Sequence, residues 1–64
     1  MREVELWRRL ETALGQAYAH AWADQVVLSE LGGRTVTEAL RDGVEAKLVW
    51  RAAWAQLELS PRDR

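Results

Sequence analysis

The sequence contains no cysteine, and this absence excludes two classes of protein. Without cysteine there is neither a disulfide framework nor a thiolate metal site. His20 is the single histidine, so a histidine-based transition-metal site is also disfavoured. We therefore expect a protein without metal ions or other cofactors, whose fold depends on packing.

Long apolar runs and an excess of positive charge are also missing. No stretch approaches the ~20 apolar residues of a transmembrane helix. The charged N-terminus, MREVELWRRL, is unlike a signal peptide. The formal net charge of −1 gives no strong positive field for binding phosphate backbones. These features predict a soluble cytoplasmic protein with no membrane partner.

What is present is a short chain rich in tryptophan. Its 64 residues suffice for one domain, with a folded surface of about 4,200 Å² by size scaling. The tryptophans, each with roughly 200 Å² of buriable surface, are Trp7, Trp22, Trp50 and Trp54. We predict a single helical domain over 1–59 and a frayed C-terminal tail over 60–64.

The apolar spacing is helical in the first half of the chain. A helix is predicted over 2–14, with Gly15 as its end. Residues 16–31 are also helix-prone, but the apolar positions change phase along them. Because a straight helix cannot bury both sets, we expect a break near Asp24, which can cap a second helical segment.

The second half of the sequence predicts two helices with defined ends. Thr35 and Glu38 have the spacing of a capping box, which opens a short helix that Gly43 stops. Glu45 is positioned to cap a last helix over 46–58. Because no alternating strand pattern occurs, the predicted fold is all-α, a compact orthogonal bundle of four to five short helices.

One run of residues resembles a known family. The segment ELGGRTV, followed by EAL and VWRA within residues 14–52, is similar to a small actinobacterial domain-of-unknown-function family, number 3046. Related sequences often carry proline at the position of Ala46 and cysteine near Trp54. The resemblance implies a bacterial cytoplasmic protein whose gene often lies beside that of a recombinase regulator. It supplies no catalytic residues, because the family has no established activity.

Catalytic chemistry has little support in the sequence. His20 and Asp24 are four residues apart, the spacing at which helical side chains meet, as in a base oriented by a carboxylate. A nucleophile is also needed, and the only serines are Ser29 and Ser60. A chain this short rarely encloses a ligand pocket. We therefore expect no enzyme and no small-molecule substrate.

The glycine pair Gly32-Gly33, followed by Arg34 and Thr35, allows two interpretations. Free N–H groups at a helix start attract anions, and Arg34 can add a charged hydrogen bond. Ordinary helix capping explains the same residues, since glycines end one helix and a threonine starts the next. The spacing also differs from that of a phosphate-binding loop. Capping is the favoured interpretation.

A helix-turn-helix is the alternative functional interpretation. Its small residue, turn glycine and apolar positions match Ala39, Gly43, Val44 and Val49. The helices near 36–41 and 46–58 would then bind DNA, in connection with recombination or repair. The contacting residues would be Lys47, Arg51 and Arg34. Asp42 at a usually apolar position, exposed Glu45 and the negative net charge weigh against it.

The leading interpretation is a protein-protein interaction module. Leu48 and Trp54 lie away from the centre of the last helix's apolar stripe, with Arg51 between them. These three residues suggest an apolar surface that the domain does not cover by itself. The outward face of the last helix is therefore predicted to bind another protein or a second copy of the chain. The sequence leaves open whether Trp54 belongs to the core or to the interface.

Overall fold

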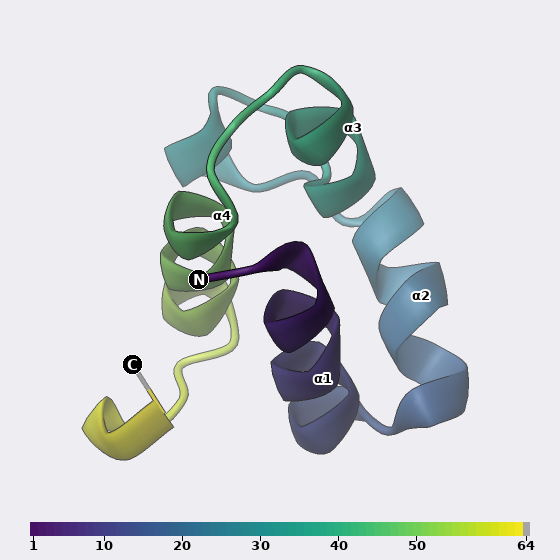
Figure 1. Ribbon diagram of the computed structural model, residues 1–64, viewed down its shortest axis with the longest axis vertical. Helices are drawn as coiled ribbons and strands as arrows, with labels where there is room; N and C mark the ends of the chain where they lie inside the picture. The colour runs from purple at the N-terminus through teal and green to yellow at the C-terminus, as the bar shows by residue number, and fades with distance from the viewer. Residues whose placement is uncertain (64) are drawn as a thin grey trace.

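The first helix begins and ends close to its predicted limits. In the computed structural model, which describes residues 1–63, α1 spans Glu3–Leu14 (Figure 1). Leu6 and Leu10, one turn apart, are completely buried. The N–H of Gly15 donates to the carbonyl of Glu11 at 2.8 Å and closes the helix. Ala13, near the end of the helix, is exposed.

The second helix ends where the apolar positions change phase. Helix α2 spans Gln16–Gln25, and Val26 is already extended. The next helical segment is only the 3-10 turn η1, Ser29–Leu31. The break near Asp24 is confirmed, but its predicted role as a helix cap is wrong. Its carboxylate accepts a hydrogen bond from the hydroxyl of Thr37, which joins α2 to the next helix.

The third helix carries the predicted capping box. Helix α3 spans Val36–Arg41. The N–H of Glu38 donates to Thr35 Oγ1 at 3.1 Å, and the N–H of Thr35 donates to Glu38 Oε1 at 2.9 Å. Just before it, the N–H of Leu28 donates to the carbonyl of Arg34 at 3.0 Å. This bond closes the loop that carries η1.

The last helix, α4, spans Ala46–Gln56 and is shorter than the predicted 46–58. Glu45 lies at its N-cap position, but its side chain makes no capping hydrogen bond, so that prediction is wrong. The chain then turns at Glu58 and forms the 3-10 turn η2, Pro61–Asp63. The predicted tail over 60–64 includes this turn, and residue 64 lies outside the described residues.

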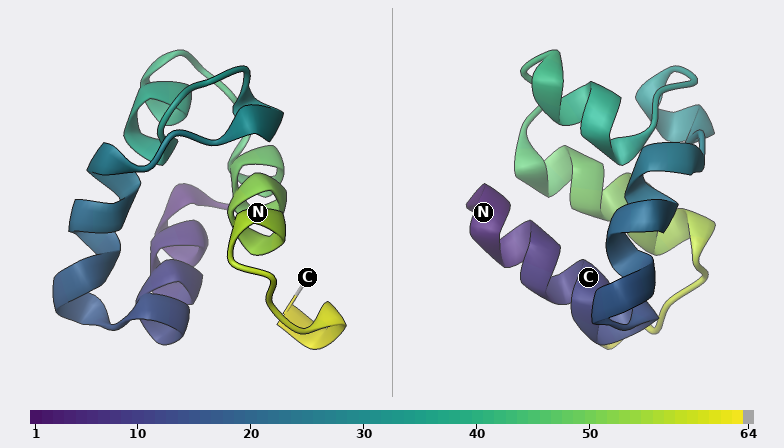
Figure 2. Two further views of the ribbon diagram at one scale, coloured as in Figure 1. Left: turned by 180° about the vertical axis from the view of Figure 1, so that it is seen from behind. Right: turned by 90° about the vertical axis from the view of Figure 1, so that its right-hand side faces the viewer.

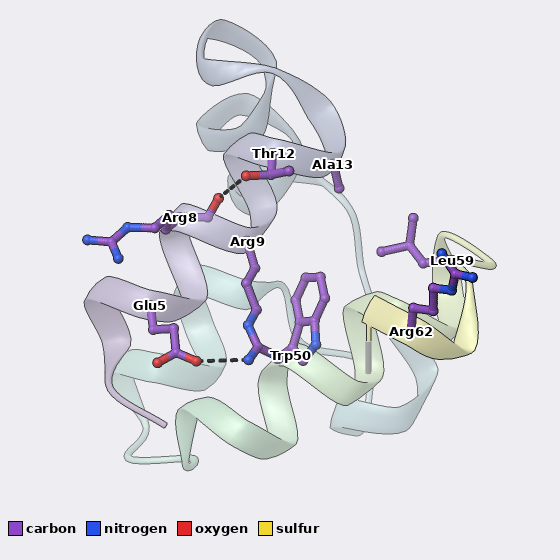
Figure 3. A pocket seen from close by; sticks show the side chains of 8 residues that line it. All are labelled: Glu5, Arg8, Arg9, Thr12, Ala13, Trp50, Leu59 and Arg62. Carbon is purple, nitrogen blue, oxygen red and sulfur yellow. Dashed lines mark hydrogen bonds and ion pairs between the residues drawn. The ribbon is translucent and has the colours of Figure 1, made fainter.

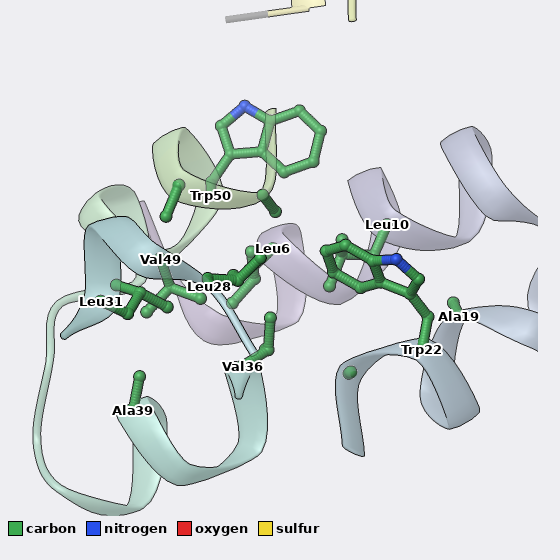
Figure 4. Packing of buried hydrophobic residues seen from close by; sticks show 13 residues of the cluster. Leu6, Leu10, Ala19, Trp22, Leu28, Leu31, Val36, Ala39, Val49 and Trp50 are labelled. Carbon is green, nitrogen blue, oxygen red and sulfur yellow. The ribbon is translucent and has the colours of Figure 1, made fainter. Parts of the chain in front are cut away.

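The four helices close a ring around one core. Helix α1 packs against α2 and α4, and α3 joins α2 to α4 from the other end, so each helix touches two others (Figures 1 and 2). Every helix contributes buried side chains, among which Trp22 and Trp50 are the largest (Figure 4). Within residues 1–63 no strand forms, apart from one isolated bridge between Leu28 and Arg34. The predicted all-α bundle is confirmed.

Candidate partner-binding groove

A groove of about 410 Å³ separates α4 from the loop that carries η1. We call it the α4 groove. Its lining combines three apolar side chains, Leu31, Val44 and Leu48, with three charged ones, Glu30, Arg34 and Arg51. The groove exists because Gly32 and its neighbours turn the loop back toward α4, against which η1 packs. The connection between α3 and α4 supplies Val44.

Leu48 is the apolar lining residue most accessible to solvent. Leu31 is buried and Val44 is partly buried against the core, whereas Leu48 is 52% exposed. Single exposed leucines are common on proteins. This leucine differs because it lies beside a concave surface that contains further apolar atoms, which is how ligand and partner sites are usually lined.

The two arginines of the groove are held differently. The Nε of Arg34 donates to Asp42 Oδ2 at 2.9 Å, and its Nη1 donates to the carbonyl of Leu31 at 3.1 Å. These two bonds fix the guanidinium at the rim. Arg51 is exposed on α4, and no hydrogen bond or ion pair joins its side chain to the side chains that the structure describes, residues 1–62. Its charge is therefore available to a ligand.

The structure divides the predicted partner-binding set. Leu48 and Arg51 lie together in the α4 groove. Trp54 does not line it and instead packs against the core, with its indole Nε1 donating to the carbonyl of Ser60 at 2.8 Å. Its contacts are those of a residue that anchors the C-terminal segment.

The alternative DNA-binding set is also divided. Arg34 and Arg51 line the groove, whereas Lys47 is exposed on α4 outside it. Asp42, which is exposed between α3 and α4, balances the charge of Arg34. The anion-loop interpretation gains no support from Arg34, whose hydrogen bonds are directed to Asp42 and to the carbonyl of Leu31.

The predicted pairing of His20 with Asp24 does not form. His20 Nε2 lies 3.3 Å from Glu11 Oε2, and its ring stacks on Trp7 with centroids 4.6 Å apart. Asp24 is hydrogen-bonded to Thr37 instead. The spacing of four residues permits a contact within α2, but α1 and α3 offer each side chain a partner on another helix. The imidazole therefore lies in the contact between α1 and α2.

A second hollow, of about 480 Å³, lies between α1 and the C-terminal segment (Figure 3). Arg9 occupies one side of it, 2.9 Å from Glu5 Oε2 and 5.7 Å from the centroid of the Trp50 ring. Figure 3 shows Arg8 directed away from this pair, on the opposite side from Arg62. The charged groups around this hollow do not converge on one point.

Sequence reasoning missed three contributors to the α4 groove. Glu30, Leu31 and Val44 come from segments that the fold brings beside α4, and no local sequence pattern indicates that arrangement. Among residues 1–63, no three potential metal-binding side chains gather in one place. The described helices are all too short or too polar to cross a lipid bilayer.

The fold and the groove together define a small all-α domain with a partly apolar, arginine-rimmed surface. More specifically, the chain belongs to the family described as "Protein of unknown function (DUF3046)", whose family model matches residues 1–62. The resemblance seen in the ELGGRTV segment is therefore confirmed. Neither a curated protein nor a solved structure matches the chain.

Proposed function

We propose that this protein is a non-enzymatic interaction module that binds another protein through the outward face of α4. The observation that carries the proposal is the position of Leu48, which is half exposed beside the α4 groove, one helical turn from Arg51. Arginine and large apolar side chains around a hollow are typical of the centre of protein interfaces. A cytoplasmic location belongs to the same proposal and is supported by the cysteine-free sequence.

The proposal is tested by capturing partners with the full chain from a lysate of its own cells, with and without nuclease. Wild-type protein is compared with Leu48→Asp, which places a charge where the interface needs an apolar group. Val4→Asp is the matched control, because Val4 is 67% exposed on another helix and does not line the α4 groove. Circular dichroism confirms that both variants are folded.

We expect nuclease-resistant partners that Leu48→Asp loses and Val4→Asp retains. Sedimentation velocity of the purified chain detects a second copy as the partner, through a mass that rises with concentration and returns to the monomer value in Leu48→Asp. If wild type and both variants capture the same partners and sediment alike, the outward face of α4 is not the binding surface.

DNA binding is the second candidate, supported by the geometry between α3 and α4. A four-residue connection, 42–45, separates the two helices, and Gly43 has the positive φ of 87° that a tight helical turn requires. Lys47 and Arg51 are exposed on α4. In this alternative α4 is the recognition helix of a DNA-binding protein connected with recombination or repair.

Fluorescence anisotropy with a short labelled DNA duplex tests this alternative. Salt-sensitive binding at low ionic strength, lost when Lys47 and Arg51 are both changed to glutamate, would support it. Absence of binding at low salt would eliminate it. Capture that survives nuclease and depends on Leu48 would favour the protein partner.

A further inference from the structure

We propose that the α4 groove recognises a peptide segment in which a carboxylate side chain lies beside a large apolar side chain. This inference rests on the proposed function and specifies the chemistry of its partner. The partner's carboxylate pairs with Arg51 and Arg34, and its apolar side chain contacts Leu48.

The charges of the groove favour a carboxylate. The lining holds two guanidinium groups, those of Arg34 and Arg51, and the carboxylate of Glu30, while Asp42 already balances the charge of Arg34. Arg51 makes no ion pair with any side chain that the structure describes, residues 1–62, so its guanidinium is the one open to a carboxylate. Guanidinium pairs with carboxylates in a planar, often two-bonded geometry, which gives direction as well as energy.

Arg34 is prepared for such a contact before the partner arrives. Its Nε and Nη1 donate to Asp42 and to the carbonyl of Leu31, so the side chain has already lost much of its rotational freedom. An arginine has further Nη donors beyond these two, and no hydrogen bond from Nη2 is found in the described chain. Because the guanidinium is held in place and has unused donors, it can bind a carboxylate oxygen in a defined position.

The apolar side of the groove explains why a peptide is expected rather than an isolated anion. Leu31 and Val44 form its inner part and Leu48 its accessible edge. Contact with Leu48 needs an apolar side chain next to the carboxylate. The volume of about 410 Å³ is sufficient for such a short segment.

The same surface disfavours a polyanion such as DNA. Glu30 lies in the lining and Asp42 beside Arg34, so closely spaced phosphates would meet like charges. A single carboxylate carries less negative charge than a run of phosphates and therefore meets less of that repulsion. A phosphate backbone also carries no apolar group at the position required by Leu48.

The test selects random twelve-residue peptides displayed on phage against the immobilised full chain. We expect the selected peptides to share an aspartate or glutamate next to a leucine, isoleucine, valine or aromatic residue. One of them, made synthetically, is then titrated against wild type, Arg51→Glu and Lys47→Glu. Lys47→Glu makes the same change of charge on α4 at an exposed position outside the groove.

Arg51→Glu is expected to weaken binding about tenfold or more, because a charged hydrogen bond is replaced by repulsion. Lys47→Glu is expected to change it by less than about threefold, through screened long-range charge alone. Peptides without a shared acidic residue, failure to select any peptide, or equal weakening by the two variants would each overturn the inference.

Failure of this inference is distinguishable from failure of the proposed function. If lysate partners depend on Leu48 but selected peptides lack an acidic residue, the interaction module stands and the carboxylate chemistry is wrong. If acidic peptides bind through Arg51 but Leu48→Asp captures the same lysate partners as wild type, the carboxylate chemistry of the groove stands and the proposed interaction module is wrong.

Discussion

Thr35 shows how much of the fold depends on single side chains with reciprocal contacts. It is buried, its hydroxyl accepts from the N–H of Glu38, and its own N–H donates to the Glu38 carboxylate. Two otherwise unsatisfied N–H groups at the start of α3 are thereby paired. This capping box ties the loop that forms one side of the α4 groove to the first turn of α3.

Replacing this side chain tests its contribution directly. We expect Thr35→Ala to lower the free energy of unfolding by about 1 kcal/mol, because a helix cap is lost. Urea denaturation followed by circular dichroism measures the change. Thr12→Ala is the control, since the Thr12 hydroxyl donates to a carbonyl within an exposed part of α1, and we expect a change within about 0.5 kcal/mol. If both substitutions lower the free energy of unfolding equally, the stabilising role of Thr35 as a helix cap would be contradicted.

The tryptophans divide into different roles that their helical spacing does not reveal. Trp22 and Trp50 are buried in the core, whereas Trp7 is partly exposed and stacked on His20. Trp54 is partly buried and donates to Ser60. Trp54 therefore contacts both the core and the C-terminal segment.

At the scale of elements, α3 and α4 end in the same way with different residues. In α3 the N–H of Val44 donates to the carbonyl of Ala39, and in α4 the N–H of Leu59 donates to that of Trp54. Both pairs form the long hydrogen bond of a Schellman motif. The motif needs one left-handed residue, which is Gly43 in the first case and Glu58, at φ 52°, in the second.

The left-handed conformation of Glu58 leads us to predict a stabilising substitution at this position. A residue with Cβ is strained in the left-handed region, and glycine is not. We expect Glu58→Gly to raise the free energy of unfolding by about 0.5–1 kcal/mol, with part of the relief offset by greater freedom of the unfolded chain. Thermal denaturation would show a higher Tm.

Gln56→Gly is the matched control, because Gln56 lies within α4 and is exposed. At this last residue of the helix, glycine is expected to destabilise by less than about 1 kcal/mol relative to a good helix former. A decrease in Tm for both variants would contradict the left-handed strain at Glu58.

At the scale of the molecule, the ring of helices makes a single core. The accessible surface is 4322 Å², close to the value of about 4,200 Å² expected from size. The Cα radius of gyration is 10.4 Å. Since each helix contacts two others around shared buried residues, no helix forms a separate core.

Cooperative unfolding is the consequence of this arrangement. We expect tryptophan fluorescence and far-ultraviolet circular dichroism to report one coincident transition in urea, with a slope of roughly 1 kcal/mol per molar, as in small two-state domains. Loss of the fluorescence signal before the helical signal would show that the core opens while helices persist, and would contradict the single cooperative unit.

The sequence by itself determined the helices and most of their ends. Apolar spacing, glycines and the T-x-x-E capping pattern are local signals, because a helix is stabilised by groups within four residues of one another. The same local patterns identified the family and singled out Leu48 and Arg51. They failed where a partner comes from elsewhere: His20 contacts Glu11 rather than Asp24, and the end of α4 was placed too late.

Only the tertiary structure decided which of these side chains meet. Arg34 and Leu48 are fourteen residues apart, and they share a groove because η1 packs against α4. Asp42 fixes Arg34 across the length of α3. Such contacts depend on how helices pack against one another, which is decided by the shape of the whole core rather than by any local pattern.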